Sequence, residues 1–156
     1  MTKMNLVAEP GMHSVIVTRE FNAPRELVYR AFIDPDLIPR WWGSGSATTT
    51  VEKLEPKKGG VWHFVQHAPD GNQYGFHGVF HELASPERLI YTFEFEGMPG
   101  HVLLETIELE DRGGKTFITD TSIFQSVADR DGMLQAGMAE GTTDSWERLD
   151  VLLKTM

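Results

Sequence analysis

Two acidic residues, Glu105 and Asp120, have the positions in this sequence that most strongly suggest chemistry. They lie on opposite sides of the glycine pair at 113–114, which favours a two-residue hairpin turn between two antiparallel strands. Counting outward from that turn pairs Ile107 with Asp120 and Glu105 with Ser122. Side chains alternate between the two faces of a strand, so all four of these residues share one face.

That shared face is otherwise apolar, since the same register adds the pairs Leu109–Ile118 and Leu103–Phe124, while the opposite face carries mainly threonine and glutamate. A carboxylate on an apolar face is costly unless it is hydrogen-bonded, and desolvation raises its pKa. Glu105 and Asp120 could therefore act as general acid and base, or bind a ligand hydroxyl or amine. Alternatively, a bulge turns both acids toward water, or ordered water and backbone groups satisfy them.

Four histidines form a second candidate group on the two strands around the turn PDGN: His63, His67, His77 and His81. Residues four apart on a strand are separated by roughly 13 Å, so neither same-strand pair can share a metal ion. Cross-strand neighbours could do so, but the strand register here is open. The sequence therefore favours exposed or hydrogen-bonded histidines, with no metal and no cofactor. His77 is the histidine that we expect to face a cavity as a base.

Aromatic residues and methionines occupy many of the expected inner positions, where the alternative role is ordinary core packing. Glycines inside a helix cost about 1 kcal/mol each relative to alanine, which indicates either close packing or space for a ligand. The tryptophan pair at 41–42 could gate a cavity or plug the core. Besides Glu105, Asp120 and His77, the predicted ligand contacts are Trp41, Trp42, Trp62, Phe64, Tyr91, Phe93, Met133, Gly137, Met138 and Gly141.

The length and composition predict one compact domain. The chain has 156 residues, of which 40% are apolar and 24% are charged, and it contains no internal repeat. A formal net charge of -9 argues against nucleic acid as a partner. We expect a flexible segment at 1–12 and a single domain at 13–156. The sequence lacks an apolar run long enough for membrane insertion and an evident signal peptide, which predicts a cytoplasmic protein.

The elements that must position the acids form an α+β fold. Residues 13–21 alternate as a strand, and Pro24 and Pro35 each begin a short helix. Six further strands separated by turn sequences run from 47 to 124, which gives a seven-stranded antiparallel sheet. Residues 129–154 predict a long C-terminal helix whose apolar stripe covers the curved sheet.

These residues resemble a known family. The motifs are TREFNAPRELVYRAFIDPDLIPRWWG at 18–43, KKGGVWHF at 57–64, DGN at 70–72, PERLIYTF at 86–93, GGKT at 113–116 and the glycine- and methionine-rich last helix. Together they resemble the START-like (SRPBCC, birch-pollen-allergen-like) superfamily over residues 13–154. The most similar branch is named for homologues of the activator of the ninety-kilodalton heat-shock chaperone's ATPase. One departure is Thr142, where many members carry tryptophan after the mid-helix glycine.

The resemblance implies a helix-grip fold with an apolar cavity between the sheet and the last helix, and it implies no shared catalytic residues. We therefore expect the chain to bind a small hydrophobic or amphipathic molecule. The first alternative is an enzyme of the cyclase, dehydratase or hydrolase type that acts on a polyketide-like or aromatic substrate. The second is a co-chaperone that activates a partner ATPase. Exposed sheet edges also make a homodimer plausible.

Overall fold

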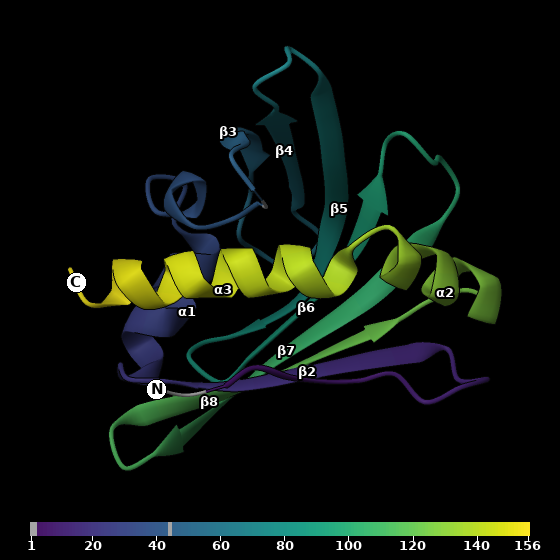
Figure 1. Cartoon of the computed structure of the whole chain (residues 1–156). Coiled ribbons are helices and arrows are strands. Elements are labelled where there is room, and N and C mark those ends of the chain that lie inside the picture. The colour runs from purple at the N-terminus through teal and green to yellow at the C-terminus, as the bar shows by residue number, and fades with distance from the viewer. Residues whose placement is uncertain (1–2, 44) are drawn as a thin grey trace.

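The computed structural model describes residues 3–43 and 45–156. It is an α+β structure in which a curved sheet wraps around a C-terminal helix (Figure 1). In chain order the elements are β1 (Asn5–Val7), β2 (Ser14–Phe21), α1 (Arg25–Ile33), the 3-10 helix η1 (Ile38–Arg40), β3 (Thr48–Leu54), β4 (Val61–His67), β5 (Gln73–Ala84), β6 (Arg88–Phe95), β7 (Val102–Arg112), β8 (Lys115–Ile123), α2 (Val127–Gln135) and α3 (Met138–Leu153).

The sheet has eight antiparallel strands in the order β1-β2-β8-β7-β6-β5-β4-β3. The helix-grip architecture predicted from the sequence is confirmed, with one strand more than the seven expected. The additional strand is β1, which lies inside the segment expected to be flexible and pairs Leu6 with Val17 of β2. Three residues carry too little periodicity to signal a strand, so its formation depends on the neighbouring edge of β2.

The hairpin between β7 and β8 has the register that the sequence predicts. Gly113 and Gly114 have φ angles of 64° and 86°, and a two-residue turn with both φ values positive matches the twist of the flanking strands. Pairing then continues without a shift to Leu104 and Ile123, through Glu105–Ser122 and Ile107–Asp120. The bulge that would have turned the acids outward is not present in this hairpin.

The segments between the sheet strands and at the C-terminus include two differences from the sequence prediction. The second proline-started helix is only the three-residue η1. The expected single C-terminal helix is divided into α2 and α3 at Ala136 and Gly137, because Gly137 adopts a left-handed conformation with φ of 99°. Only glycine adopts this conformation without a steric penalty. The chain therefore changes direction above the sheet, and α3 alone crosses its concave side (Figure 1).

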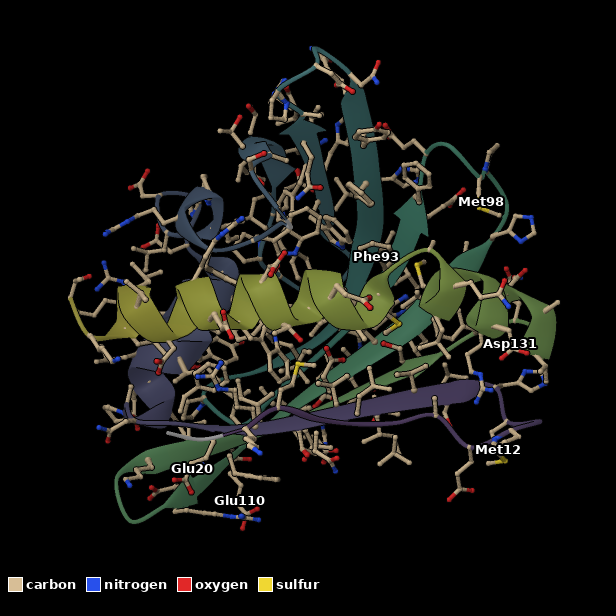
Figure 2. All side chains as sticks on the ribbon, viewed as in Figure 1. Met12, Glu20, Phe93, Met98, Glu110 and Asp131 are labelled. Carbon is tan, nitrogen blue, oxygen red and sulfur yellow. The ribbon has the colours of Figure 1, made fainter. Side chains whose placement is uncertain are left out.

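The core lies between α1, α3 and the half of the sheet formed by β2, β8, β7 and β6. Leu149 of α3 and Val15 and Phe21 of β2 are fully buried there. Phe93 points into the space between sheet and helices, whereas Glu110 lies at the outer end of a strand (Figure 2). Within residues 3–43 and 45–156, no helix combines the length and apolar character needed to cross a bilayer.

Candidate functional site

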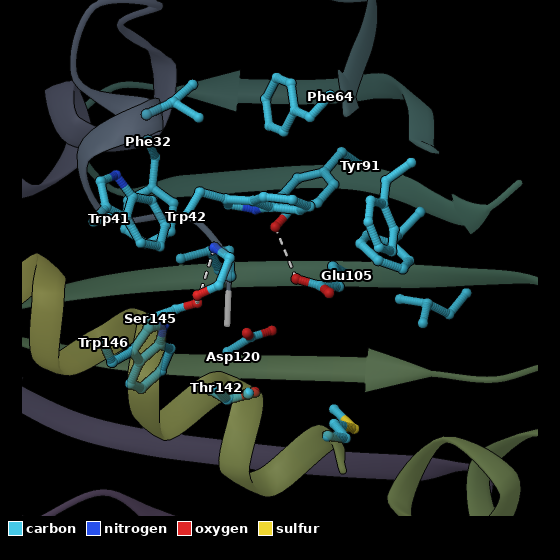
Figure 3. A pocket seen from close by; sticks show the side chains of 18 of the residues that line it. Phe32, Trp41, Trp42, Phe64, Tyr91, Glu105, Asp120, Thr142, Ser145 and Trp146 are labelled. Carbon is cyan, nitrogen blue, oxygen red and sulfur yellow. Dashed lines mark hydrogen bonds between the residues drawn. The ribbon is translucent and has the colours of Figure 1, made fainter. Parts of the chain in front are cut away.

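A cavity of about 340 Å³ lies between the concave face of the sheet and α3 (Figure 3). Its floor comes from β4 to β8, and its remaining walls come from α1, η1 and the two C-terminal helices. The described residues that line it are Phe32, Ile38, Trp41, Trp42, Gly43, Trp62, Phe64, Gln66, Phe76, Phe80, Leu89, Tyr91, Phe93, Leu103, Glu105, Ile107, Asp120, Met133, Ala136, Gly137, Met138, Gly141, Thr142, Ser145 and Trp146.

The lining includes every residue that the sequence analysis assigned to a ligand site except His77. It also includes residues that sequence reasoning missed, among them Phe76 and Phe80 on β5 and Ser145 and Trp146 on α3. The sequence did contain a signal for Phe76 and Phe80, because their spacing places both on one face of the strand and His77 on the other. To decide which of these two faces is the inner one, the register between β4 and β5 must be known, and the residues of the turn do not determine it.

The adjacent tryptophans have different roles. Trp41 is 4% exposed, its indole Nε1 donates a hydrogen bond to the Ala31 carbonyl at 2.9 Å, and its ring packs edge-on against Phe32. It therefore acts mainly as a plug of the core. Trp42 packs its ring edge-on against Phe64 and Phe76, with centroid separations of 5.1 and 5.3 Å. Trp42 is thus part of the aromatic wall of the cavity.

The polar centre of the cavity consists of Tyr91, Glu105 and Asp120, which come from the adjacent strands β6, β7 and β8. Tyr91 and Glu105 are cross-strand partners, and the Tyr91 hydroxyl donates a hydrogen bond to Glu105 Oε2 at 2.8 Å. Asp120 is diagonal to Glu105 on the same face of the sheet (Figure 3). Among the described residues, Asp120 Oδ1 is a buried side-chain oxygen with no hydrogen-bond partner.

Burial raises the pKa of all three groups, Tyr91, Glu105 and Asp120. Desolvation raises the pKa of Asp120 well above its usual range, and the nearby Glu105 charge and a hydrogen bond with Glu105 raise it further. Desolvation also raises the pKa of Glu105, although hydrogen bonds from Tyr91 and Asp120 oppose that rise. The pKa of Tyr91 is raised by burial and by both carboxylates. Burial therefore favours the protonated form of both carboxyl groups, and most strongly that of Asp120.

This arrangement predicts that Asp120→Asn stabilises the protein at neutral pH. The raised pKa of Asp120 contributes stability that is complete below the ordinary aspartate pKa of 3.8 and is lost as the pH rises through the raised value. Asparagine resembles the protonated acid and avoids that loss. We expect a free energy of unfolding about 1–2 kcal/mol higher than the parent's near pH 7, as measured by urea denaturation.

The gain from Asp120→Asn should shrink as the pH falls toward the ordinary aspartate pKa. Glu108→Gln is the matched control, because Glu108 is an exposed acid on β7 and its replacement removes the same formal charge. A difference between Asp120→Asn and the parent that did not vary with pH would contradict the raised pKa.

The cavity is also bounded by a connection between α3 and the chain after η1. Ser145 Oγ accepts a hydrogen bond from the Gly43 amide at 3.1 Å and donates one to the Gly43 carbonyl. Thr49 Oγ1 donates to the Trp42 carbonyl at 2.7 Å. The two Ser145 bonds hold Gly43 against the N-terminal half of α3, and the Thr49 bond holds Trp42 to β3.

The structure corrects the expectation for His77, which lies on the outer face of the sheet. Its side chain is 42% exposed, and its Nδ1 lies 3.0 Å from Glu96 Oε2. The physical reason is the register of β4 and β5: it pairs His63 with His77 and Phe64 with Phe76, so the phenylalanines take the inner face. Across residues 3–43 and 45–156, no group of three or more histidine or acidic side chains could hold a metal ion.

Comparison with known proteins agrees with this fold. The family model described as Activator of Hsp90 ATPase homolog 1-like protein matches residues 22–154. A solution structure of a protein from Arthrobacter aurescens superposes with a TM-score of 0.90 at 26% identity, covering 97% of this chain and 92% of that chain. A crystal structure of a protein from Rhodobacter sphaeroides gives a TM-score of 0.88 at 25% identity, with 100% of both chains covered.

A crystal structure of a protein from Mycobacterium smegmatis has a TM-score of 0.88 at 21% identity over 97% of each chain, which shows a shared fold. No match was found among curated proteins. The family model covers most of the chain, including α1, the sheet from β3 to β8 and both C-terminal helices. The chain therefore belongs to the family of Activator of Hsp90 ATPase homolog 1-like proteins, within the START-like (SRPBCC) superfamily.

Proposed function

We propose that the protein binds a small hydrophobic or amphipathic molecule in the cavity between the sheet and α3. The observation that carries this proposal is the cavity itself, which is lined mainly by aromatic and aliphatic side chains and has two acids at one place in its wall. Its volume of about 340 Å³ lies at the lower end of the range of roughly 300–1,000 Å³ typical of small-molecule sites. The apolar surroundings favour an apolar ligand body, and Glu105 and Asp120 would bind its polar end.

A direct test combines native mass spectrometry with dye displacement. We expect the purified protein to bind Nile red, a neutral dye whose fluorescence increases in an apolar environment. We further expect aliphatic or aromatic compounds that fit the cavity to displace it, and adducts of one molecule per chain to appear in the native spectra. Failure of a broad set of neutral, cationic and anionic hydrophobes to bind by either method would refute the proposal.

A second candidate function, acid–base catalysis, is favoured by the Tyr91–Glu105–Asp120 arrangement. Two neighbouring carboxyl groups whose pKa values are raised by burial, Asp120 more strongly than Glu105, would serve as proton donor and proton acceptor within one apolar cavity. This would suit a cyclase, dehydratase or hydrolase acting on a polyketide-like or aromatic molecule. The native spectra separate the two functions, since simple binding releases the molecule unchanged and catalysis releases it with altered structure. A co-chaperone role stays a prediction, to be tested by the effect of the protein on a chaperone's ATPase rate.

A further inference from the structure

The charges inside the cavity are unbalanced. Glu105 and Asp120 are the acidic residues of the described lining, and none of the other lining residues that the structure describes is a lysine, an arginine or a histidine. A buried carboxylate ordinarily has a basic partner or several hydrogen-bond donors. Glu105 has the Tyr91 hydroxyl, whereas Asp120 Oδ1 has no partner. The balancing charge is thus not supplied by the cavity wall.

The groups packed around the acid pair on each neighbouring element are neutral or engaged elsewhere. On β2, the residue paired with Asp120 is Val17. Arg19, two residues further along β2, lies 3.6 Å from Asp150 of α3 and stacks over the Phe21 ring. On α3, the residues facing the cavity near the pair are uncharged, Thr142 and Ser145 (Figure 3). On β6, the facing group is the Tyr91 hydroxyl, which donates to Glu105.

The walls near the acids are aromatic. Tyr91 is beside Glu105 and packs edge-on against Trp62, at a centroid separation of 6.0 Å. Trp62 in turn lies 5.8 Å from Phe93. Aromatic faces attract cations, and they do so most strongly where water is excluded. A cation placed at this corner of the cavity would therefore gain both from the carboxylates and from the rings, whereas an anion would be repelled by the carboxylates.

We infer that the ligand is a protonated amine carried on an apolar body, with its ammonium group against Glu105 and Asp120 and its body between the aromatic walls and α3. This inference depends on the proposed binding function and specifies the chemistry of the ligand. An ammonium has three donors. It can supply the hydrogen bond that Asp120 Oδ1 lacks and the positive charge that the lining lacks. A neutral alcohol offers one donor and no charge.

The proposal is tested with three probes of equal chain length, n-octylamine, n-octanol and n-octanoate, using isothermal titration calorimetry near neutral pH. Because the apolar chain is the same in all three probes, differences in affinity measure the contribution of the polar end group. We expect octylamine to bind about tenfold more tightly than octanol, equivalent to about 1.4 kcal/mol, since hydrogen bonds to charged groups are stronger than neutral ones. Octanoate should bind most weakly.

The variant Glu105→Gln with Asp120→Asn identifies the source of the preference. In this double variant, octylamine and octanol should differ by less than about threefold, while octanol affinity stays close to that of the parent. Glu108→Gln removes one exposed acid from the same strand and should retain the full preference for the amine. Thermal denaturation of each variant checks that it folds.

The pH dependence gives an independent measurement. An alkylamine stays protonated up to a pKa of about 10, and the cavity gains negative charge as the pH rises through the raised pKa of Asp120. Octylamine affinity should therefore rise as the pH increases from the ordinary aspartate pKa through the raised pKa of Asp120, and octanol affinity should not. The opposite trend, with the amine weakened as the pH rises, would contradict an ion pair at this site.

The remaining outcomes separate this inference from the proposed function. Equal or tighter binding of octanol would overturn the inference and leave a neutral-ligand site. An amine preference that persisted in the double variant would also overturn it, since the acids would not be its source. If Nile red and all three probes failed to bind, the proposed function and the inference would both fail.

Discussion

Replacing Thr142 with tryptophan is expected to abolish ligand binding. Thr142 projects from α3 toward the cavity, so an indole at this position enters the space that a ligand would occupy (Figure 3). A tryptophan side chain is far larger than threonine and would fill much of the space in a cavity of about 340 Å³. We expect Nile red affinity to fall by about a hundredfold or more, equivalent to about 2.7 kcal/mol.

Val151→Trp is the matched control, because Val151 lies on α3 with 63% of its surface exposed. This variant adds a comparable side chain to the same helix and should bind the dye like the parent. Circular dichroism and thermal denaturation would show that Thr142→Trp folds, since insertion into a cavity need not strain the core. Dye binding that was unchanged in a folded Thr142→Trp protein would show that Nile red occupies another place.

Gly78→Ala is expected to cause the largest loss of stability. A Cβ atom at this position would lie 1.8 Å from the Thr92 carbonyl oxygen and 2.5 Å from Trp62 Nε1, distances that require the strands to move. The missing side chain allows the Trp62 indole to cross β5 and donate a hydrogen bond to the Thr92 carbonyl at 3.2 Å. We expect the free energy of unfolding to decrease by about 3 kcal/mol or more, measured by urea denaturation.

The control for this effect is Gly132→Ala in α2. A Cβ atom at Gly132 would have no neighbour within 4 Å, and alanine favours the helix by about 1 kcal/mol relative to glycine. The two substitutions add the same methyl group and should change stability in opposite directions. If Gly78→Ala were as stable as the parent, the contact between Trp62 and β6 would have to be maintained by a shifted backbone.

The position of the two acids could be predicted because it depends on local chemistry. A glycine pair that permits positive φ values fixes the turn, and strict alternation along the two strands then fixes the face of each side chain. Both Glu105 and Asp120 follow from this count, and the structure confirms it. The apolar lining was predicted for the same reason, since aromatic residues alternate with polar ones along β4 and β6.

His77 shows where such a count fails. The connection from Ala68 to Asn72 could have been shorter, and a change of one residue in register exchanges the two faces of a strand. The observed pairing of His63 with His77 places both outside, where they contact Glu96. The alternation of side chains within each strand was therefore predicted correctly. The length of the loop, however, did not determine which face of β5 lies toward the cavity.

The sequence alone determined the order of strands β2 to β8, the register of the β7–β8 hairpin and the presence of two acids on an apolar face, because each depends on residues close together in the chain. Only the tertiary structure decided that Tyr91 donates to Glu105, that Asp120 Oδ1 lacks a partner, and that the last helix is divided at Gly137. The first two features arise from contacts between strands, whose spacing depends on the packing of the whole domain, and the third arises from the left-handed conformation that Gly137 adopts in the folded chain.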